Sequence, residues 1–196
     1  MEARDILENA RKFNSLPEAL SGFQYAVATT RRGGRLRANA LDPRSMARRL
    51  VDFVPRNRIA LVFGPEDRGL NNEELCLCQA VVTIPTNPDF PSVNLAQAVM
   101  IILWEIAAAA AGPTGVSEIP VLAEIGRVEN MYRHMEKVLL EIGYLHPENP
   151  QRMIRALKRV LNRTGLEERD IRAIRGIFRQ FDWYFKKNLT KGENSD

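Results

Sequence analysis

Cysteine and histidine are scarce in this 196-residue chain, and long hydrophobic runs are missing. The two cysteines, Cys76 and Cys78, form one C-x-C pair without a second pair nearby, which argues against a disulfide framework and a metal site. The longest apolar run, residues 98–111, is interrupted by Glu105 and is too short to span a bilayer, so it predicts a buried helix. The first residues show no signal-peptide pattern. We therefore expect a reduced, cytoplasmic protein without membrane segment or metal.

Charge is unevenly distributed along the chain. The net charge is +4, and this excess lies in residues 127–196, because basic and acidic side chains nearly cancel before them. A basic segment beside a near-neutral one is typical of proteins that bind nucleic acid, although a solvated helical surface is an equal alternative on charge alone.

Short strands and helices alternate along residues 1–111. The expected elements are helices at 3–13 and 16–20, a strand at 25–29, a helix at 43–53, a strand at 59–63, a helix at 71–78, a strand at 80–84 and a helix at 94–110. Asp42 is the expected N-cap of the 43–53 helix, with Pro43 at its first position. This alternation predicts an α/β fold in which a mainly parallel sheet has helices on both faces.

Residues beyond 111 show helical patterns only. Residues 112–120 combine Gly, Pro and Ser without periodicity and predict a linker. Amphipathic patterns at 120–142, 150–162 and 168–188 predict an all-helical C-terminal extension over residues 121–188, and we expect the tail, 189–196, to be disordered. Within the last helix, Trp183 and Tyr184 are expected to pack in the bundle, with stacking on a base as the alternative.

Two irregular loops follow neighbouring strands and predict a ligand site. GPEDRGL, residues 64–70, follows one strand, and PTNPDFPSVNLA, residues 85–96, follows another. Such loops at one edge of a parallel sheet often hold a cofactor. The first loop is no P-loop, since no Gly-Lys-Ser/Thr follows, and alone it fits a structural turn better. Ser92 or Asn94 can cap the next helix, but three nearby prolines also stiffen a cavity for a flat ligand.

These motifs resemble those of a known enzyme family. IALVFGPEDRGL, VTIP and FPSVNLAQAV, in this order, resemble motifs two and three of the SpoU class of SPOUT RNA methyltransferases. VATTRR upstream is similar to the TrmJ-like tRNA branch, as are ENMYRHMEKVLLEIGYLHPENPQRMIRALKRVLNR and IRAIRGIF downstream. The resemblance extends from Ala3 to about Phe185.

The resemblance implies a fold, a cofactor and a reaction. The implied fold is a sheet with a trefoil knot at the C-terminal end of the α/β domain, a rare exception to the absence of knots in proteins. The knot binds S-adenosyl-L-methionine, the protein is a homodimer, and the RNA site lies across the dimer interface. The reaction is methylation of a ribose 2′-hydroxyl, which in the TrmJ-like branch belongs to the tRNA anticodon loop. Ribosomal RNA is the alternative substrate.

The resemblance also assigns roles to residues. The implied cofactor-binding residues are Val27, Ala28, Thr29, Gly64, Ile84, Ser92 and Val93. The implied catalytic residues are Arg32, Ser92 and Asn94, whereas Glu66 and Asn94 match motif residues that hold the knot and the dimer together. Arginine suits phosphate through its planar fork, and substrate RNA is expected at Arg31, Arg32, Arg35 and Arg37.

One family motif has no counterpart in this sequence. The segment N-x-G-x-x-A-R of motif one, which supplies an arginine thought to activate the ribose hydroxyl, is not found before Ala3. A second reading therefore stands beside the enzyme: a catalytically deficient dimer that binds S-adenosyl-L-methionine and RNA. On that reading, this polypeptide binds the cofactor but methylates poorly.

Overall fold

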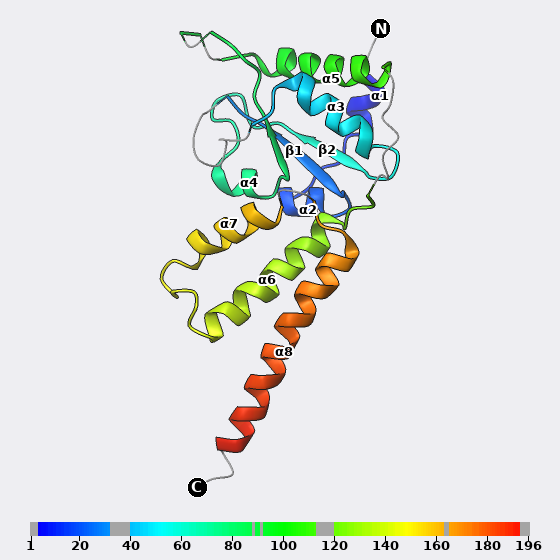
Figure 1. Ribbon diagram of the computed structural model, residues 1–196. Coiled ribbons are helices and arrows are strands. Elements are labelled where there is room, and N and C mark those ends of the chain that lie inside the picture. Colours follow the sequence, from blue (N-terminus) through cyan, green and yellow to red (C-terminus); the bar gives the residue numbers. More distant parts are fainter. Residues whose placement is uncertain are drawn as a thin grey trace.

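The structure is a computed structural model of the chain that describes residues 4–31, 40–87, 89–90, 92–112, 120–162 and 165–192. An α/β part contains the sheet, and a helical extension points away from it (Figure 1). The N-terminal end lies at the edge of the α/β part, near α1, whereas the C-terminal end lies at the far tip of the extension (Figure 1). The sheet and the helices packed on it come first in the chain, and the helices of the extension follow.

Three parallel strands form the sheet, in the order β2-β1-β3. They are β1 (Tyr25–Thr29), β2 (Ile59–Val62) and β3 (Ala80–Val82). The central strand, β1, is buried over its first four residues, as expected for a parallel strand covered on both faces. The predicted strands are therefore confirmed, with β2 and β3 slightly shorter than expected.

Helices surround the sheet, and a side-chain N-cap marks the start of each helix but the first. They are α1 (Arg4–Glu8), α2 (Leu16–Leu20), α3 (Pro43–Phe53), α4 (Asn72–Cys76) and α5 (Leu95–Ala110). Asp42 caps α3 as predicted, since its Oδ1 accepts from the Ser45 amide at 3.0 Å and Pro43 follows as the first helical residue.

Alternating side chains of β1 enter two separate cores, one on each face of the sheet. Ala26 and Ala28 pack with residues of α2 and α4, whereas Tyr25 and Val27 pack with residues of α3 and α5. The period-two alternation of the strand explains this division. The expectation of helices on both faces is confirmed.

The helical extension consists of α6 (Ile125–Glu141), α7 (Pro150–Leu161) and α8 (Glu168–Gly192). Its core includes Met131, Tyr132 and Ile171, which lie where α6 and α8 pack together. Two boundaries differ from the prediction. The first helix begins at Ile125 and not at Pro120, because the Ala123 amide bonds to the Leu166 carbonyl at 2.7 Å instead of joining a helix. The last helix continues past Asn188 to Gly192, into the segment expected to be disordered.

Asn57 joins the α/β part to the start of the extension. Its Nδ2 donates to the Pro120 carbonyl at 2.9 Å, and its Oδ1 accepts from the Leu122 amide at 2.8 Å. The side chain is 7 % exposed and also bonds to the Phe53 carbonyl. The amide of Gly126 adds a bond to the Ser21 carbonyl at 3.2 Å. These hydrogen bonds attach the extension directly beside the sheet. The intervening linker lies largely outside the described residues.

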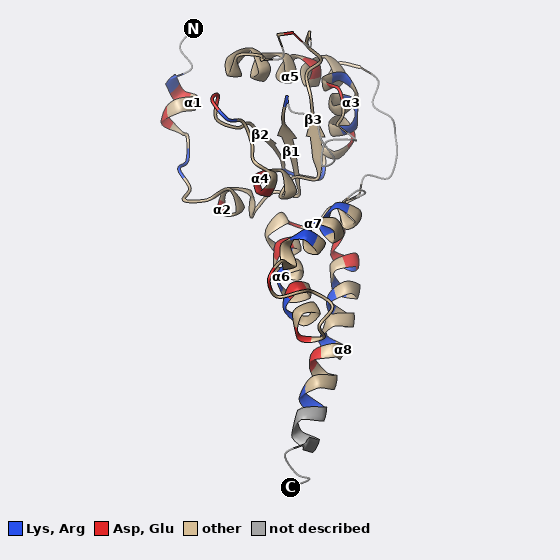
Figure 2. Ribbon diagram, turned by 90° about the vertical axis from the view of Figure 1, so that its left-hand side faces the viewer, with Lys and Arg blue, Asp and Glu red and all other residues tan. Residues whose placement is uncertain are grey.

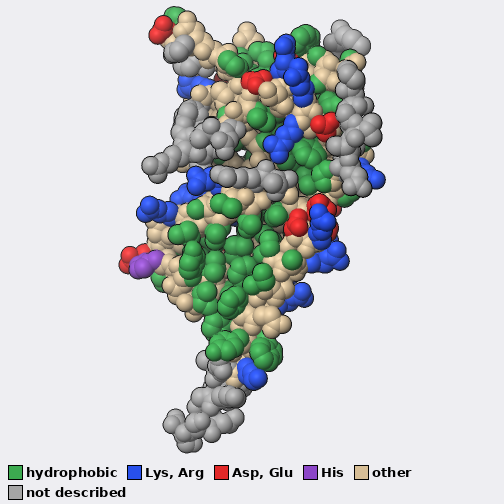
Figure 3. Space-filling model, viewed as in Figure 1, with side chains coloured by type: hydrophobic (Ala, Val, Ile, Leu, Met, Phe, Trp, Pro, Cys, Tyr) green, Lys and Arg blue, Asp and Glu red, His purple; other side chains and the backbone are tan. Residues whose placement is uncertain are grey.

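Two predictions about burial are wrong. The long helix α5 was expected to be buried, yet only Ile102 is, whereas Met100 is 67 % and Trp104 59 % exposed. Helix α5 packs against α3 with one side and is almost free of charged side chains (Figure 2). Trp183 and Tyr184 are likewise exposed, and hydrophobic side chains gather over one face of the extension (Figure 3). Apolar composition predicts burial without saying whether the covering surface belongs to the same chain.

Candidate functional site

A pocket lies where the three parallel strands end. Thr29, Thr30 and Arg31 line it from the end of β1, the segment after β2 lines it with residues 63–66 and 68–70, and the loop after β3 lines it with Ile84 and Ser92. The remaining lining residues are Val82, Val93, Leu95 and Ala98. Ligands of open parallel sheets bind at this carboxyl edge. The pocket thus brings together the two loops that the sequence singled out.

The loop of residues 64–70 folds back on itself so closely that Gly64 has no room for a side chain. A Cβ at Gly64 would lie 2.3 Å from the carbonyl carbon of Gly69. Gly69 has a φ of 67°, in the left-handed region that favours glycine, and its amide bonds to the Pro65 carbonyl at 2.8 Å. Both glycines are therefore required by the loop's backbone, which brings main-chain polar groups to the pocket.

Asn94 connects the two loops. Its Nδ2 donates to Oε1 of Glu66 at 2.8 Å, and its Oδ1 accepts from the amides of Ala96 and Gln97. The same side chain therefore caps α5 and holds the glycine loop. Of the two capping candidates in the sequence, Asn94 is the N-cap, whereas Ser92 points its hydroxyl elsewhere.

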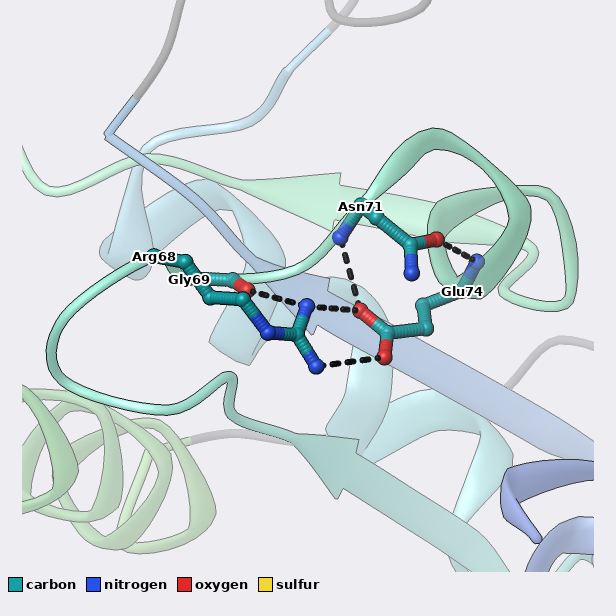
Figure 4. A network of polar contacts seen from close by, with 4 residues as sticks. All are labelled: Arg68, Gly69, Asn71 and Glu74. Atoms are coloured by element: carbon teal, nitrogen blue, oxygen red, sulfur yellow. Dashed lines mark hydrogen bonds and ion pairs between the residues drawn. The ribbon is translucent and has the colours of Figure 1, made fainter.

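Arg68 holds the glycine loop from its other side. Its Nη1 and Nη2 lie 3.3 Å from the two carboxylate oxygens of Glu74, and Nη1 also donates to the Gly69 carbonyl at 3.2 Å (Figure 4). Glu74 in turn accepts from the Asn71 amide at 2.7 Å, within the capping box that starts α4. Arg68 lowers the pKa of Glu74 through this hydrogen-bonded pair, aided by the Asn71 amide, so the carboxylate is the stable form.

Ser92 and Arg31 meet across the pocket. Arg31 Nη1 donates to Ser92 Oγ at 2.8 Å, which places a guanidinium beside the hydroxyl. Both residues were predicted site residues, and both line the pocket. The structure therefore places the guanidinium of Arg31 within hydrogen-bonding distance of the Ser92 hydroxyl at this pocket.

The predicted site residues divide into three groups. Those lining the pocket are Thr29, Gly64, Ile84, Ser92, Val93 and Arg31, and Asn94 lies beside it through Glu66. Val27 and Ala28 are fully buried in the two cores and do not line it, because a central strand exposes only its end to the carboxyl edge. Arg32, Arg35 and Arg37 lie outside the described residues.

Sequence reasoning missed Arg68 and the apolar walls Phe63 and Leu70. Arg68 belongs to the loop of residues 64–70, in which the sequence assigned roles to Gly64 and Glu66 but none to this arginine. Its spacing to Glu74, at the third position of a helix that begins with a capping-box pattern, was an available signal.

The described residues contain no group of three or more His, Cys, Asp or Glu side chains that could hold a metal ion. Cys76 is partly exposed and Cys78 buried, and both are free. Among the helices of the described ranges, none has the length and apolar character to cross a membrane.

Two family profiles match this chain. Residues 1–104 match the SpoU rRNA methylase family, and residues 126–193 match the tRNA methyltransferase TrmJ C-terminal domain. The boundary between the matches falls between the α/β part and the helical extension, so both parts of the fold have a counterpart.

Curated relatives match over most of the chain. It is 37 % identical, over 89 % of its length and 73 % of the relative's, to the tRNA (cytidine/uridine/adenosine-2'-O-)-methyltransferase TrmJ of Pseudomonas aeruginosa. It is 33 % identical to the tRNA (cytidine/uridine-2'-O-)-methyltransferase TrmJ of Escherichia coli K12, over 95 % of the chain and 78 % of that protein.

Solved structures agree with the fold. The crystal structure of TrmJ from Z. mobilis ZM4 superposes with a TM-score of 0.79 at 28 % identity, covering 92 % of this chain and 77 % of that one. A probable methylase family protein from Haemophilus influenzae, also 28 % identical, gives a TM-score of 0.54, covering 95 % of this chain and 78 % of that one.

Proposed function

This chain belongs to the SpoU rRNA methylase family of RNA methyltransferases, with a C-terminal domain of the TrmJ type, and we propose that it transfers a methyl group from S-adenosyl-L-methionine to a ribose 2′-hydroxyl of tRNA. The observation that carries this proposal is the pocket at the carboxyl edge of the sheet, built from the family's two motif loops. The relatives at 33–37 % identity are named as tRNA 2′-O-methyltransferases, which supports tRNA as the substrate.

The pocket's chemistry fits this cofactor. Phe63, Leu70 and Ile84 offer apolar surface for an adenine ring, and the backbone of the glycine loop offers amide and carbonyl groups for its polar edge. The Thr29 and Thr30 hydroxyls are suited to the polar parts of the ligand. When bound, the cofactor supplies an electrophilic methyl group on its sulfonium sulfur. We propose that the loops of residues 64–70 and 85–96 belong to the trefoil knot that the family resemblance implies.

Arg31 and Ser92 both line the pocket and are joined by a hydrogen bond. We propose that this guanidinium and hydroxyl orient the ribose and its adjoining phosphate, since an attacking 2′-hydroxyl must be held in line and must lose its proton. Arg32, Arg35 and Arg37, which lie outside the described residues, follow within six positions in the sequence and remain proposed RNA contacts on their charge alone. Asn94 contributes by holding the two loops, because both ends of its carboxamide are engaged.

Helix α5 is the proposed dimer interface. Met100, Leu103 and Trp104 lie three and four residues apart, so they share a helix face, and all three are more than half exposed. The single charged residue of the helix, Glu105, is paired with Arg44 at 3.5 Å. An uncharged apolar face of this kind on a helix next to the pocket suits a second copy of the chain, which would complete the RNA site.

The anticodon loop is the proposed target within tRNA, and the cytoplasm the proposed location. A splayed single-stranded loop exposes its riboses, as in-line attack by a 2′-hydroxyl requires. Two free cysteines in the described residues suit a reducing compartment.

A methyl-transfer assay with the purified full chain tests the proposal. S-adenosyl-L-methionine labelled in its methyl group is incubated with unmodified tRNA or with ribosomal RNA, and the digested RNA is examined by mass spectrometry for 2′-O-methylnucleosides. We expect label on an anticodon-loop ribose of tRNA. Label on ribosomal RNA alone would overturn the substrate assignment, and cofactor binding without transfer to either RNA would overturn the enzymatic assignment.

A further inference from the structure

We propose that Arg68 is a positioning residue that sets the affinity of the pocket for its cofactor, acting through its ion pair with Glu74. This inference rests on the proposed function, because it takes the cofactor to be S-adenosyl-L-methionine. Nothing in the family motifs assigns a role to this side chain, which lies between the motif glutamate, Glu66, and the second glycine of the loop, Gly69.

The loop that carries Arg68 has little core of its own. Residues 65–68 are all exposed, and only Leu70, at the loop's end, is buried among residues of β1 and α4. An exposed segment without apolar burial keeps one shape only if polar contacts hold it. The loop's geometry therefore depends on a small number of tethers.

Two side-chain tethers hold the loop from opposite sides. Glu66 bonds to Asn94 at the start of α5, and Arg68 bonds to Glu74 in the first turn of α4. The second tether ends on a fixed point, because Glu74 is held by the capping box with Asn71, and Leu75 beside it is 4 % exposed. Arg68 thereby connects the wall of the pocket to the first turn of α4, and Figure 4 shows these contacts.

Arg68 also acts on the backbone that faces the ligand. Its Nη1 donates to the Gly69 carbonyl at 3.2 Å while the same guanidinium pairs with both oxygens of Glu74. A planar guanidinium with two partners fixes their relative position, which a lysine cannot do with one ammonium. Without Arg68, the loop has to be ordered when the ligand binds. The free energy that this ordering costs is lost from the binding free energy, so the affinity for the ligand falls.

This role has a distinctive signature. The pair is exposed to water, so its removal changes the free energy of unfolding little. Cofactor affinity, in contrast, should fall by about fivefold, the order expected when one exposed tether of a binding loop is removed. If the pair served only the stability of the fold, its removal would change neither the affinity for the cofactor nor the Michaelis constant for the cofactor.

The test uses four variants of the full chain, the last of which is Arg68→Lys, and one control. Arg68→Gln removes the guanidinium, and Glu74→Gln removes the charge while keeping the capping box, because glutamine serves at the same position. The third is the double variant. Arg127→Gln is the matched control, since Arg127 pairs with Glu168 at 3.0 Å on the helical extension, away from the pocket. Binding of S-adenosylhomocysteine is measured by calorimetry, alongside the melting temperature.

We expect each single variant to weaken binding by about fivefold and the double variant to weaken it no further, because the two side chains act as one pair. Arg68→Lys should recover part of the loss, because a lysine keeps the positive charge opposite Glu74. Wild-type affinity in Arg68→Gln, or losses that add in the double variant, would overturn the inference while leaving the proposed function intact. Absence of binding by the wild-type chain would instead overturn the proposed function.

Discussion

Asn94 donates from Nδ2 to Oε1 of Glu66 at 2.8 Å, so one side chain joins the two loops that form the pocket. Its Oδ1 caps α5 at the same time. Helix initiation and pocket closure are therefore linked at one residue, and substitutions can separate the two roles.

Replacing Asn94 by serine should keep the cap but lose the link. Serine is a good N-cap but is too short to reach Glu66, so we expect stability within a few tenths of a kcal/mol of wild type and weaker binding of S-adenosylhomocysteine. Asn94→Ala should lose both and cost about 1 kcal/mol of unfolding free energy. Urea unfolding and calorimetry measure the two effects. Unchanged ligand affinity in Asn94→Ser would contradict the linking role.

Substitution of Trp104 should separate the proposed dimer. A glutamate at this position places a charge on the apolar face of α5, which an interface core does not tolerate, so we expect a monomer in sedimentation experiments. Trp183→Glu is a matched control, because Trp183 is 56 % exposed and lies on α8. The interface assignment fails if the wild type is already monomeric, or if Trp104→Glu keeps the wild-type assembly.

Asn57→Ala should destabilise the whole chain. The change leaves the buried amide of Leu122 without its partner, and the Pro120 carbonyl loses its bond too, so we expect a loss of about 2 kcal/mol in urea unfolding. Asn9→Ala serves as control, because Asn9 makes its hydrogen bond on the exposed surface, and it should change stability by less than about 0.5 kcal/mol. Equal stability of both variants would show that Asn57 is no anchor.

Stability should fall as the solution becomes alkaline. Burial raises the pKa of the Cys78 thiol to about 12, and burial also raises the pKa of the Tyr25 and Tyr132 hydroxyls. Each group is neutral in the folded chain, whereas the unfolded chain releases its proton at a lower pH. The stabilisation is therefore complete below the unfolded thiol pKa of 9.0 and is lost progressively as pH rises toward 12.

Urea midpoints at pH 7.5 and 10 measure this loss. Cys78→Ala should lower stability at both values but show a smaller drop between them, since one of the titrating groups is gone. Burial also raises the pKa of the Cys76 thiol, so Cys76→Ser should likewise show a smaller drop. In that variant the buried Cys78 thiol should react with a thiol reagent only after unfolding. A midpoint that does not change between the two pH values would contradict the prediction.

Much of this fold was predictable because its signals are local. The run YAVAT gives β1 with its predicted bounds, and Asp42 followed by Pro43 gives the start of α3. The helix boundary at Ile125 was not predictable, because it depends on Ala123 pairing with Leu166, a contact between distant segments.

The site was predictable to the level of its loops. Two irregular segments after parallel strands indicated where the pocket lies, and Gly64 and Ser92, which the family resemblance assigns to the cofactor, are among its lining residues. The pairing of Arg31 with Ser92, and of Arg68 with Glu74, depends on how the loops fold in space. The exposed face of α5 was not predicted, because an apolar sequence does not reveal whether the surface that buries it belongs to the same chain or to a partner.

The attachment through Asn57 also bears on how separable the two halves of this protein are. Their family profiles match separate stretches, residues 1–104 and 126–193, as if each half were an interchangeable module. Yet the carbonyls of Ser21 and Phe23, ahead of the central strand, bond to the first amides of α6, and Leu122 belongs to the core that covers one face of the sheet. An exchange of helical extensions between relatives would therefore have to carry residues 120–126 along, since they are part of the catalytic half in space although they follow it in sequence.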